Sequence, residues 1–267
     1  MENAQVKVMG VLNVTPDSFF DGGQYTQAST AVNQAIKLIN AGASIIDIGG
    51  ESTRPGASPV SLDEELNRVI PVIEALRRQS EISISIDTSK PEVMIQAIRA
   101  GANIINDVCA LRQPGALQAA VELDVPVCLM HMMGEPRSMQ KDPHYEDVVS
   151  EVSAFLEGRV KCCINAGIKT KNIWLDPGFG FGKSLGHNLS LLKHLNKFVK
   201  TGHPILVGMS RKSMLAGILN TEPEDRLVGS LALATIAIMN GASFVRVHDV
   251  KETVQVVKVC EAVMLAR

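Results

Sequence analysis

Short hydrophobic runs rich in Val and Ile alternate along the chain with longer stretches in which apolar positions recur every three or four residues. The first pattern is typical of buried β-strands, and the second is typical of amphipathic helices. Eight runs predict strands, and their ends recur about every 34 residues, the length of a strand, a helix and two loops. The predicted strands are 6–12, 44–48, 82–86, 103–106, 126–130, 172–175, 204–208 and 243–247.

The helical stretches carry start and stop patterns. A helix is predicted over 61–78, with a bend at Pro71, because proline removes a backbone donor from the helix interior. Ser61 and Ser89 are each followed three residues later by a glutamate, which is the spacing of a capping box. Helix ends are predicted at glycines, because glycine adopts the left-handed turn that stops a helix. These glycines are Gly42, Gly101, Gly167 and Gly241.

Strands that are buried on both faces and linked by helices must form a parallel sheet. Eight strand–helix units in about 250 residues match the size of a (β/α)8 TIM barrel, a fold of the α/β class. A doubly wound open sheet is the alternative, but no Gly-x-Gly-x-x-Gly motif joins the first strand to the first helix. No linker or shift of composition divides the chain, so residues 1–267 are predicted to form one domain.

Composition narrows the class of protein. Lys and Arg number 26 and Asp and Glu 28, and this net charge of −2 argues against binding to nucleic acid. No run of about 18 apolar residues predicts a membrane span, and the first residues lack a signal-peptide pattern. The five cysteines and six histidines show no zinc-ligand spacing. We therefore expect a cytoplasmic protein with reduced thiols, no zinc site and no membrane or nucleic-acid partner.

Polar side chains gather where the predicted strands end, and in a barrel these carboxyl ends form the active face. Asp87, Asn106 and Asp176 are acceptor-rich groups that can bind the N–H-rich edge of a flat heterocycle such as an aminopyrimidinone. Asn13 can add a neutral oxygen ligand for Mg²⁺. Basic residues at other strand ends suit a phosphate or another leaving anion, and they are Arg54, Lys212, Arg246 and His248. The sequence therefore predicts an enzyme with a carboxylate pocket beside a cationic pocket.

Other polar residues near the predicted mouth have structural interpretations as well. Asp47 either caps a turn and bonds backbone amides or serves the site, and both interpretations stay open. Asp107 follows Asn106 directly, so strand alternation turns it to the other face and favours a structural role. His131 is interpreted as a histidine satisfied behind the site. The Gly-Phe-Gly-Phe-Gly run at 178–182 lacks a P-loop ending, and its glycines are expected to let Phe181 approach a ligand.

Several motifs together resemble those of the dihydropteroate synthase family. The resemblance spans nearly the whole chain in the right order, and no motif position departs from the family pattern. The motifs are Leu-Asn-Val-Thr-Pro-Asp-Ser-Phe at 12–19, Asp-Ile-Gly-Gly-Glu-Ser-Thr-Arg-Pro-Gly at 47–56, Ile-Asp-Thr-Ser-Lys-Pro at 86–91, Asp-Pro-Gly-Phe-Gly-Phe-Gly-Lys at 176–183, Gly-Met-Ser-Arg-Lys-Ser at 208–213 and Arg-Val-His-Asp-Val at 246–250.

The resemblance implies a transferase of folate biosynthesis. It would condense 6-hydroxymethyl-7,8-dihydropterin diphosphate with 4-aminobenzoate to give 7,8-dihydropteroate and diphosphate, and sulfonamides would compete with 4-aminobenzoate. Asn13 would bind the Mg²⁺ that accompanies the diphosphate. Members of the family are commonly homodimers formed by helices late in the chain, so a homodimer is expected.

The same resemblance assigns roles to residues of this chain. Lys212, Asp87 and Asp176 would be catalytic. The pterin diphosphate would be bound by Thr53, Arg54, Asp87, Asn106, Asp176, Lys212, Arg246 and His248, with Asn106 and Asp176 on the aminopyrimidine edge. The 4-aminobenzoate pocket would be formed by Phe19, Pro55, Phe181 and Ser213, beside Lys212.

Two other functions compete with this one. A methyltetrahydrofolate-using methyltransferase on the same barrel would keep the acceptors but would not need the 13–21 loop or Arg-Lys-Ser at 211–213. A non-catalytic pterin-binding relative would take up the pterin diphosphate without consuming it. The loops 14–24 and 52–60, rich in Gly, Pro and Ser, are expected to close over the site and exclude water.

Overall fold

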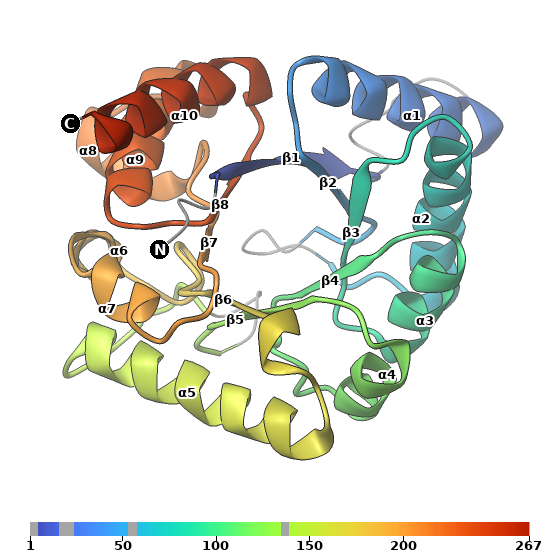
Figure 1. Ribbon diagram of the computed structural model, residues 1–267, viewed down its shortest axis with the longest axis horizontal. Coiled ribbons are helices and arrows are strands. Elements are labelled where there is room, and N and C mark those ends of the chain that lie inside the picture. The colour runs from blue at the N-terminus through green and yellow to red at the C-terminus, as the bar shows by residue number, and fades with distance from the viewer. Residues whose placement is uncertain (1–4, 16–23, 53–57, 135–138, 267) are drawn as a thin grey trace.

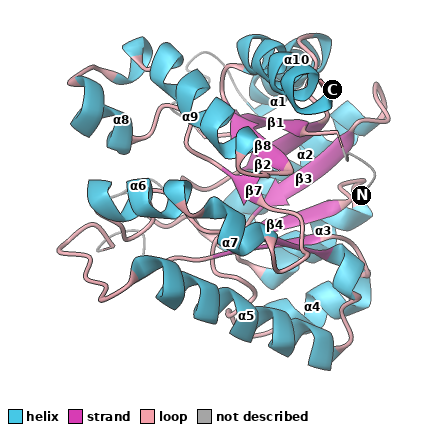
Figure 2. Ribbon diagram, turned by 60° about the vertical axis from the view of Figure 1, so that its left-hand side comes forward, coloured by secondary structure: helices cyan, strands magenta, loops and turns pink. Residues whose placement is uncertain are grey.

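The computed structural model describes residues 5–15, 24–52, 58–134 and 139–266. Eight parallel strands form the centre of the molecule, and helices surround them on the outside (Figures 1 and 2). The strands are β1 Lys7–Asn13, β2 Ile45–Gly49, β3 Ser83–Asp87, β4 Ile104–Asp107, β5 Val127–Met130, β6 Ile173–Asp176, β7 Leu206–Val207 and β8 Phe244–Val247. The helices are α1 Gln24–Asn40, α2 Leu62–Arg77, α3 Pro91–Arg99, α4 Ala116–Leu123, α5 Val148–Ala166, α6 Leu185–Lys193, α7 Leu195–Val199, α8 Ser213–Leu219, α9 Leu227–Met239 and α10 Val250–Leu265.

The sheet closes into a barrel. Its strand order is β6-β5-β4-β3-β2-β1-β8-β7, so β6 and β7 are the two outer strands of an opened sheet. A parallel bridge between Leu175 and Ile205 joins these edges, and the amide of Leu175 donates to the carbonyl of Pro204 at 2.9 Å. The predicted (β/α)8 barrel is therefore confirmed, and the open sheet is excluded.

Alternation along the strands explains how the barrel interior is built. Helix-facing strand residues join the main core, whereas the opposite set forms a separate apolar cluster inside the barrel. In that cluster the rings of Trp174 and Phe244 stack with their centroids 4.1 Å apart. The cluster consists of Met9, Ile45, Ile104, Cys128, Trp174, Leu206 and Phe244.

The next inward position lies two residues further along each strand, toward its carboxyl end. On β2, β4, β6 and β8 this position is polar, and its residues are Asp47, Asn106, Asp176 and Arg246. The two-residue repeat of the strands therefore places a polar layer next to the apolar cluster inside the barrel, on the side of the barrel mouth.

The cap at Ser61 and the glycine helix ends are confirmed, but the reciprocal half of the Ser61 capping box is not, because the Glu64 carboxylate pairs with Arg68. Ser61 caps α2 by accepting from the amide of Glu64, and α2 continues through Pro71. Ser89 does not cap α3, because its hydroxyl donates to Asp107 instead and the helix begins with Pro91. Proline suits this first helical position, because its fixed φ fits the helix and an amide hydrogen there would have no partner in the helix. All four glycines predicted to end helices have positive φ angles.

In the ranges that the structure describes, no helix combines the length and apolar character that a membrane span requires.

Candidate active site

The first half of the polar layer is a network around one arginine. The guanidinium of Arg246, at the end of β8, donates through Nε to Asp47 Oδ2 at 2.6 Å and through Nη2 to Asp87 Oδ2 at 2.7 Å. Asn106 on β4 donates through Nδ2 to the same Asp47 oxygen at 3.3 Å. Four side chains from four strands are therefore held together at the mouth.

Burial shifts the ionisation of this network. Loss of solvent raises the pKa of Asp87 to about 7, although the nearby Arg246 cation lowers it. The neighbouring carboxylate of Asp47 adds to the rise. Burial alone lowers the pKa of the Arg246 guanidinium. The nearby carboxyl groups of Asp47 and Asp87 have the larger combined effect and raise this pKa. Arg246 therefore stays a cation between two carboxyl groups.

The second half of the layer combines Asp176 with Lys212. Asp176 ends β6, and its Oδ1 accepts the amide of Gly178 at 2.7 Å. Lys212 follows β7 and donates through Nζ to the carbonyl of Phe179, and the same Nζ lies 4.4 Å from the centre of the Phe181 ring. Burial lowers the pKa of Lys212 to about 8, while Asp176 raises it. Both charges therefore lie in a poorly solvated part of the mouth.

The loop between β6 and α6 has a backbone that only glycine accommodates. Gly178, Gly180 and Gly182 all have positive φ, and a Cβ on Gly178 would lie 1.8 Å from the carbonyl oxygen of His131. The close approach lets the loop fold back against the end of β5. The glycine run is therefore a compact turn that carries Phe181 to the site.

A buried amine lies behind this loop. Lys183 Nζ contacts His131 Nδ1 at 2.9 Å, and burial followed by the Lys183 charge lowers the pKa of His131 to about 3. The interpretation of His131 as a satisfied histidine behind the site is confirmed. Asp107 likewise has structural partners, accepting from Ser89 and from the amides of Cys109 and Leu111.

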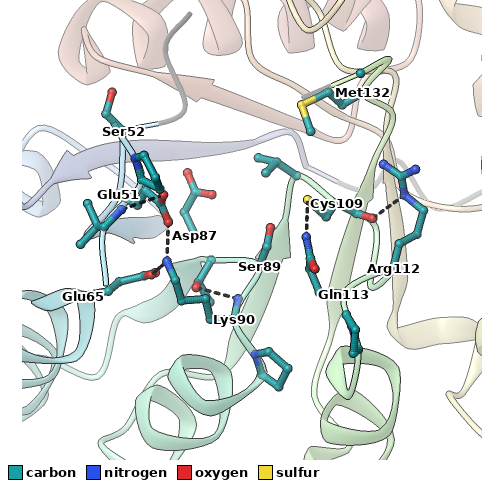
Figure 3. Close-up of a pocket in the computed structure, with 17 residues that line it drawn as sticks. Glu51, Ser52, Glu65, Asp87, Ser89, Lys90, Cys109, Arg112, Gln113 and Met132 are labelled. Carbon is teal, nitrogen blue, oxygen red and sulfur yellow. Dashed lines mark hydrogen bonds and ion pairs between the residues drawn. The ribbon is translucent and has the colours of Figure 1, made fainter. Parts of the chain in front are cut away.

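A cleft of about 760 Å³ opens beside the mouth, with Asp87 among its lining residues (Figure 3). Lys90 at the start of α3 forms ion pairs with Glu51 and with the fully buried Glu65. Glu51 also accepts the amide of Val60 at 3.2 Å. These contacts tie the segments after β2 and β3 together at one side of the site.

Comparison with known proteins assigns the chain to a family. A model of the pterin binding enzyme family matches residues 9–248. The dihydropteroate synthase of Escherichia coli K12 is 56% identical over 97% of this chain and 92% of its own length. The chain belongs to the dihydropteroate synthase family. The predictions of an enzyme, of a folate-pathway transferase and of this family are thereby confirmed.

Solved dihydropteroate synthases share the fold. The Yersinia pestis enzyme, in complex with a sulfonamide drug, is 50% identical with a TM-score of 0.94, covering all of this chain and 97% of that chain. The Xanthomonas albilineans enzyme with 4-aminobenzoic acid is also 50% identical with a TM-score of 0.94, covering 98% of this chain and 94% of that chain. This close agreement extends the family assignment to the three-dimensional structure.

The structure brings several predicted dihydropteroate synthase residues together. Asn106, Asp176 and Arg246 lie in the polar layer, Asp87 contacts it through Arg246, and the Lys212 charge lies near Asp176. Thr53, Arg54, Pro55 and Phe19 lie outside the described residues.

Three further predicted residues lie at the ends of elements. The imidazole of His248 is exposed, and its Nδ1 lies 3.0 Å from Ser210 Oγ. Ser213 is exposed at the start of α8, and Asn13 is half-buried at the end of β1.

Two features differ from the sequence interpretation of this dihydropteroate synthase site. The expected separation of a cationic from a carboxylate pocket is wrong, because Arg246 lies between Asp47 and Asp87. Asp47 neither caps a turn nor bonds backbone amides among the described contacts, since its partners are Arg246 and Asn106. Its inward register, two residues after Ile45, is the signal that would have indicated a place in the barrel mouth.

Proposed function

We propose that the barrel mouth condenses 6-hydroxymethyl-7,8-dihydropterin diphosphate with 4-aminobenzoate, giving 7,8-dihydropteroate and diphosphate. The observation that carries this proposal is that four polar side chains gather at the barrel mouth, next to the apolar cluster inside the barrel. They are Asp87, Asn106, Asp176 and Lys212. The pKa of Lys212 responds to both Asp176 and Asp87, so these charges share one neighbourhood. A flat heterocycle with several N–H groups matches such a set of acceptors.

Recognition of the pterin falls to the acceptors of the polar layer. Asp176 and Asn106 accept hydrogen bonds from the aminopyrimidine edge, and Asp87 accepts from the ring nearby. Lys212 supplies a donor to the pterin carbonyl side. As the diphosphate departs, the methylene carbon gains positive charge, and the carboxylates of Asp87 and Asp176 stabilise it.

Basic and hydroxyl side chains bind the departing diphosphate, and they are Arg246, His248, Thr53 and Arg54. Mg²⁺ supplies additional stabilisation of the leaving anion when bound. Within the described residues, no three His, Cys, Asp or Glu side chains gather as metal ligands. A single amide oxygen from Asn13 fits a Mg²⁺ that arrives with the substrate, because Mg²⁺ commonly keeps water and phosphate oxygens in its shell.

The amine of 4-aminobenzoate attacks the methylene carbon from a pocket formed by Phe19, Pro55, Phe181 and Ser213. Phe181 supports the aromatic ring, and Lys212 lies beside it. An arylamine is already neutral near pH 7, so positioning serves the attack more than a strong base does. The relatives with bound 4-aminobenzoic acid and bound sulfonamide support this pocket and support sulfonamides as competitors.

The setting of the reaction is proposed on two further observations. All five cysteines are free thiols, which supports the reducing cytoplasm as the compartment. Exposed apolar side chains on α9 and α10, among them Val228 and Val259, support a homodimer through these helices.

The test is diphosphate release measured with and without 4-aminobenzoate and Mg²⁺. Wild-type protein should release diphosphate only when both substrates and Mg²⁺ are present. Asp176→Asn should lower turnover by about 100-fold or more, because it removes a charge that faces the developing cation. Lys193→Gln, on the exposed side of α6, is the control and should keep the wild-type rate.

Two results would overturn the proposal. One is a wild-type rate in folded Asp176→Asn. The other is calorimetric binding of the pterin diphosphate with no turnover, which would identify a pure binder.

A further inference from the structure

Lys183 is a charged side chain in a place where the protein would ordinarily put an apolar one. Only 3% of the residue is exposed, and it lies where the β6–α6 loop turns into α6. Burying an ammonium costs several kcal/mol unless its protons are all bonded. A residue retained at that cost has a task that Met or Leu would not perform.

The contacts of Lys183 account for each of its protons. Nζ lies 2.8 Å from the carbonyl of Gly178, 3.0 Å from that of Phe181 and 2.9 Å from His131 Nδ1. Nζ also lies 3.4 Å from the carbonyl of His131. Burial lowers the pKa of Lys183 to about 7, so the amine and the ammonium are both present near neutral pH. Either form has at least two N–H donors, enough for the carbonyls of Gly178 and Phe181. The lowered pKa of His131 keeps its imidazole neutral, so Nδ1 either accepts from the ammonium of Lys183 or donates to its neutral amine.

The two carbonyls belong to a loop that has one apolar anchor, Phe179, which is fully buried in the main core and whose carbonyl accepts from Lys212. Its glycines at 178, 180 and 182 adopt positive φ and contribute no side chains to packing. Away from Phe179 the loop is held by hydrogen bonds to its backbone, one of which Gln140 donates to the carbonyl of Gly180. Besides those from Lys183, Tyr145 donates to the carbonyl of Gly182 at 2.9 Å, and Asn188 accepts the amide of Gly180 at 2.7 Å.

Through this backbone, Lys183 is connected to one group in each of the two proposed substrate pockets. Gly178 is fixed on its two sides, because its carbonyl binds Lys183 while its amide donates to the carboxylate of Asp176. Phe181 is fixed in the same way, because its carbonyl binds Lys183 while its ring lies under the amine of Lys212. One buried lysine nitrogen therefore holds the backbone behind a proposed pterin-binding group and a proposed aminobenzoate-binding group.

We propose that Lys183 is a positioning residue, whose side-chain nitrogen donates to the carbonyls of Gly178 and Phe181 and thereby positions Asp176 and Phe181 for the two substrates. The inference rests on the proposed function of the mouth. Lys183 touches neither substrate. Its loss loosens the ground-state fit of both, so the KM values rise more than kcat falls.

The experiment compares Lys183→Met with Tyr145→Phe and Lys193→Met. Tyr145→Phe removes a hydrogen bond to the same loop at Gly182 and leaves the two carbonyls bound by Lys183 untouched. In Lys183→Met, KM for 4-aminobenzoate and for the pterin diphosphate should each rise about tenfold or more, with kcat lowered less. Tyr145→Phe should stay within about threefold, and Lys193→Met should match wild type.

Lys183→Gln keeps two of the three donors, so its KM values should lie between those of wild type and Lys183→Met. If Lys183→Met does not fold, this variant carries the test alone. Wild-type KM values in either folded variant, or a loss of activity that merely follows the fraction unfolded, would overturn the inference.

Calorimetric titration with each substrate separates this inference from the proposed function. Weaker binding to the variants supports the positioning role even if no product forms. Equal binding to wild type and variants refutes it, whatever the wild-type turnover is.

Discussion

At the level of single residues, Asp87, Lys212 and Lys183 all ionise close to neutral pH. We expect Asp87 and Lys212 to set the pH profile, because a neutral Lys183 amine still donates to its two carbonyls. Burial raises the pKa of Asp87 to about 7 and lowers that of Lys212 to about 8. Asp87 acts as a carboxylate, so kcat/KM should rise as the pH increases through 7. Lys212 acts as an ammonium, so kcat/KM should fall above 8. The profile should therefore be a narrow bell with its maximum between these values.

Substitutions test which residue causes each limb of the bell-shaped pH profile of kcat/KM. Lys212→Arg keeps its charge at high pH, so the basic limb should move upward even if the rate falls. Asp87→Asn cannot ionise, so the acidic limb should disappear from its residual activity. Initial rates between pH 5.5 and 9.5 measure both profiles, and unchanged limbs in both variants would contradict the assignment.

Asp47 is the residue whose role depends most on its partners. It is fully buried and holds both Arg246 and Asn106 in place. Asp47→Asn removes one of the two carboxylates that face a buried cation, so we expect the free energy of unfolding to fall by about 3 kcal/mol. Affinity for the pterin diphosphate should fall about tenfold as well, because Arg246 loses its alignment.

The control for this change is Asp124→Asn, which breaks an exposed ion pair with Lys169. Such a surface pair contributes at most about 1 kcal/mol. Denaturant unfolding and calorimetry measure the two variants side by side. Equal losses of stability would show that the Asp47 network is no stronger than a surface pair.

The sequence allowed part of this site to be predicted and not the rest. Asp87, Asn106 and Asp176 stand at strand ends, where strand position alone indicates the mouth. Nothing in the pattern singled out Lys183, because its partners are backbone carbonyls and a histidine 52 positions away. The position of Arg246 between carboxylates also depends on side-chain directions that strand spacing does not give.

At the level of elements, strand positions were predicted within one or two residues. Most observed strands begin and end about one residue later than predicted, and β7 is shorter, only Leu206–Val207. The helix start at Ser89 was wrong because a capping spacing does not exclude a stronger local alternative. There, the hydroxyl of Ser89 donates to the carboxylate of Asp107, and the helix begins at Pro91.

An alanine substitution in the β6–α6 loop, compared with one after α7, distinguishes the cost of a left-handed backbone from the cost of a steric clash. Gly178 and Gly202 both have positive φ, but a Cβ on Gly202 would meet nothing within 4 Å. Gly202→Ala should therefore cost only about 1 kcal/mol of stability. Gly178→Ala adds a clash with the backbone of His131 and should cost about 4 kcal/mol or more, with loss of activity.

Thermal unfolding and diphosphate release measure both alanine variants under the same conditions. Similar stabilities would mean that the loop can move away from β5 at little cost. That result would also weaken the view of this loop as a fixed wall of the site.

For the whole molecule, counting strand–helix units was enough to predict a barrel, because eight such units have one common closed arrangement. The contact that closes it was not foreseen. The bridge between Leu175 and Ile205 joins β6 to the residues just before β7. A two-residue strand has little pattern of its own, so its pairing follows from the closure of the barrel.

The outer surface leads to the last prediction, which concerns assembly. Val228 on α9 is 78% exposed and Val259 on α10 is 64% exposed, and the two helices pack against each other. An aspartate at either position keeps the barrel intact but places a charge in an apolar interface. If a homodimer forms there, Val228→Asp and Val259→Asp should each shift the mass in sedimentation from twice 28.7 kDa to the single-chain value. Leu189→Asp on α6, which is 41% exposed on a different helix, should leave the dimer unchanged. A wild-type protein that sediments as a single chain at micromolar concentration would show that the exposed valines serve no self-association.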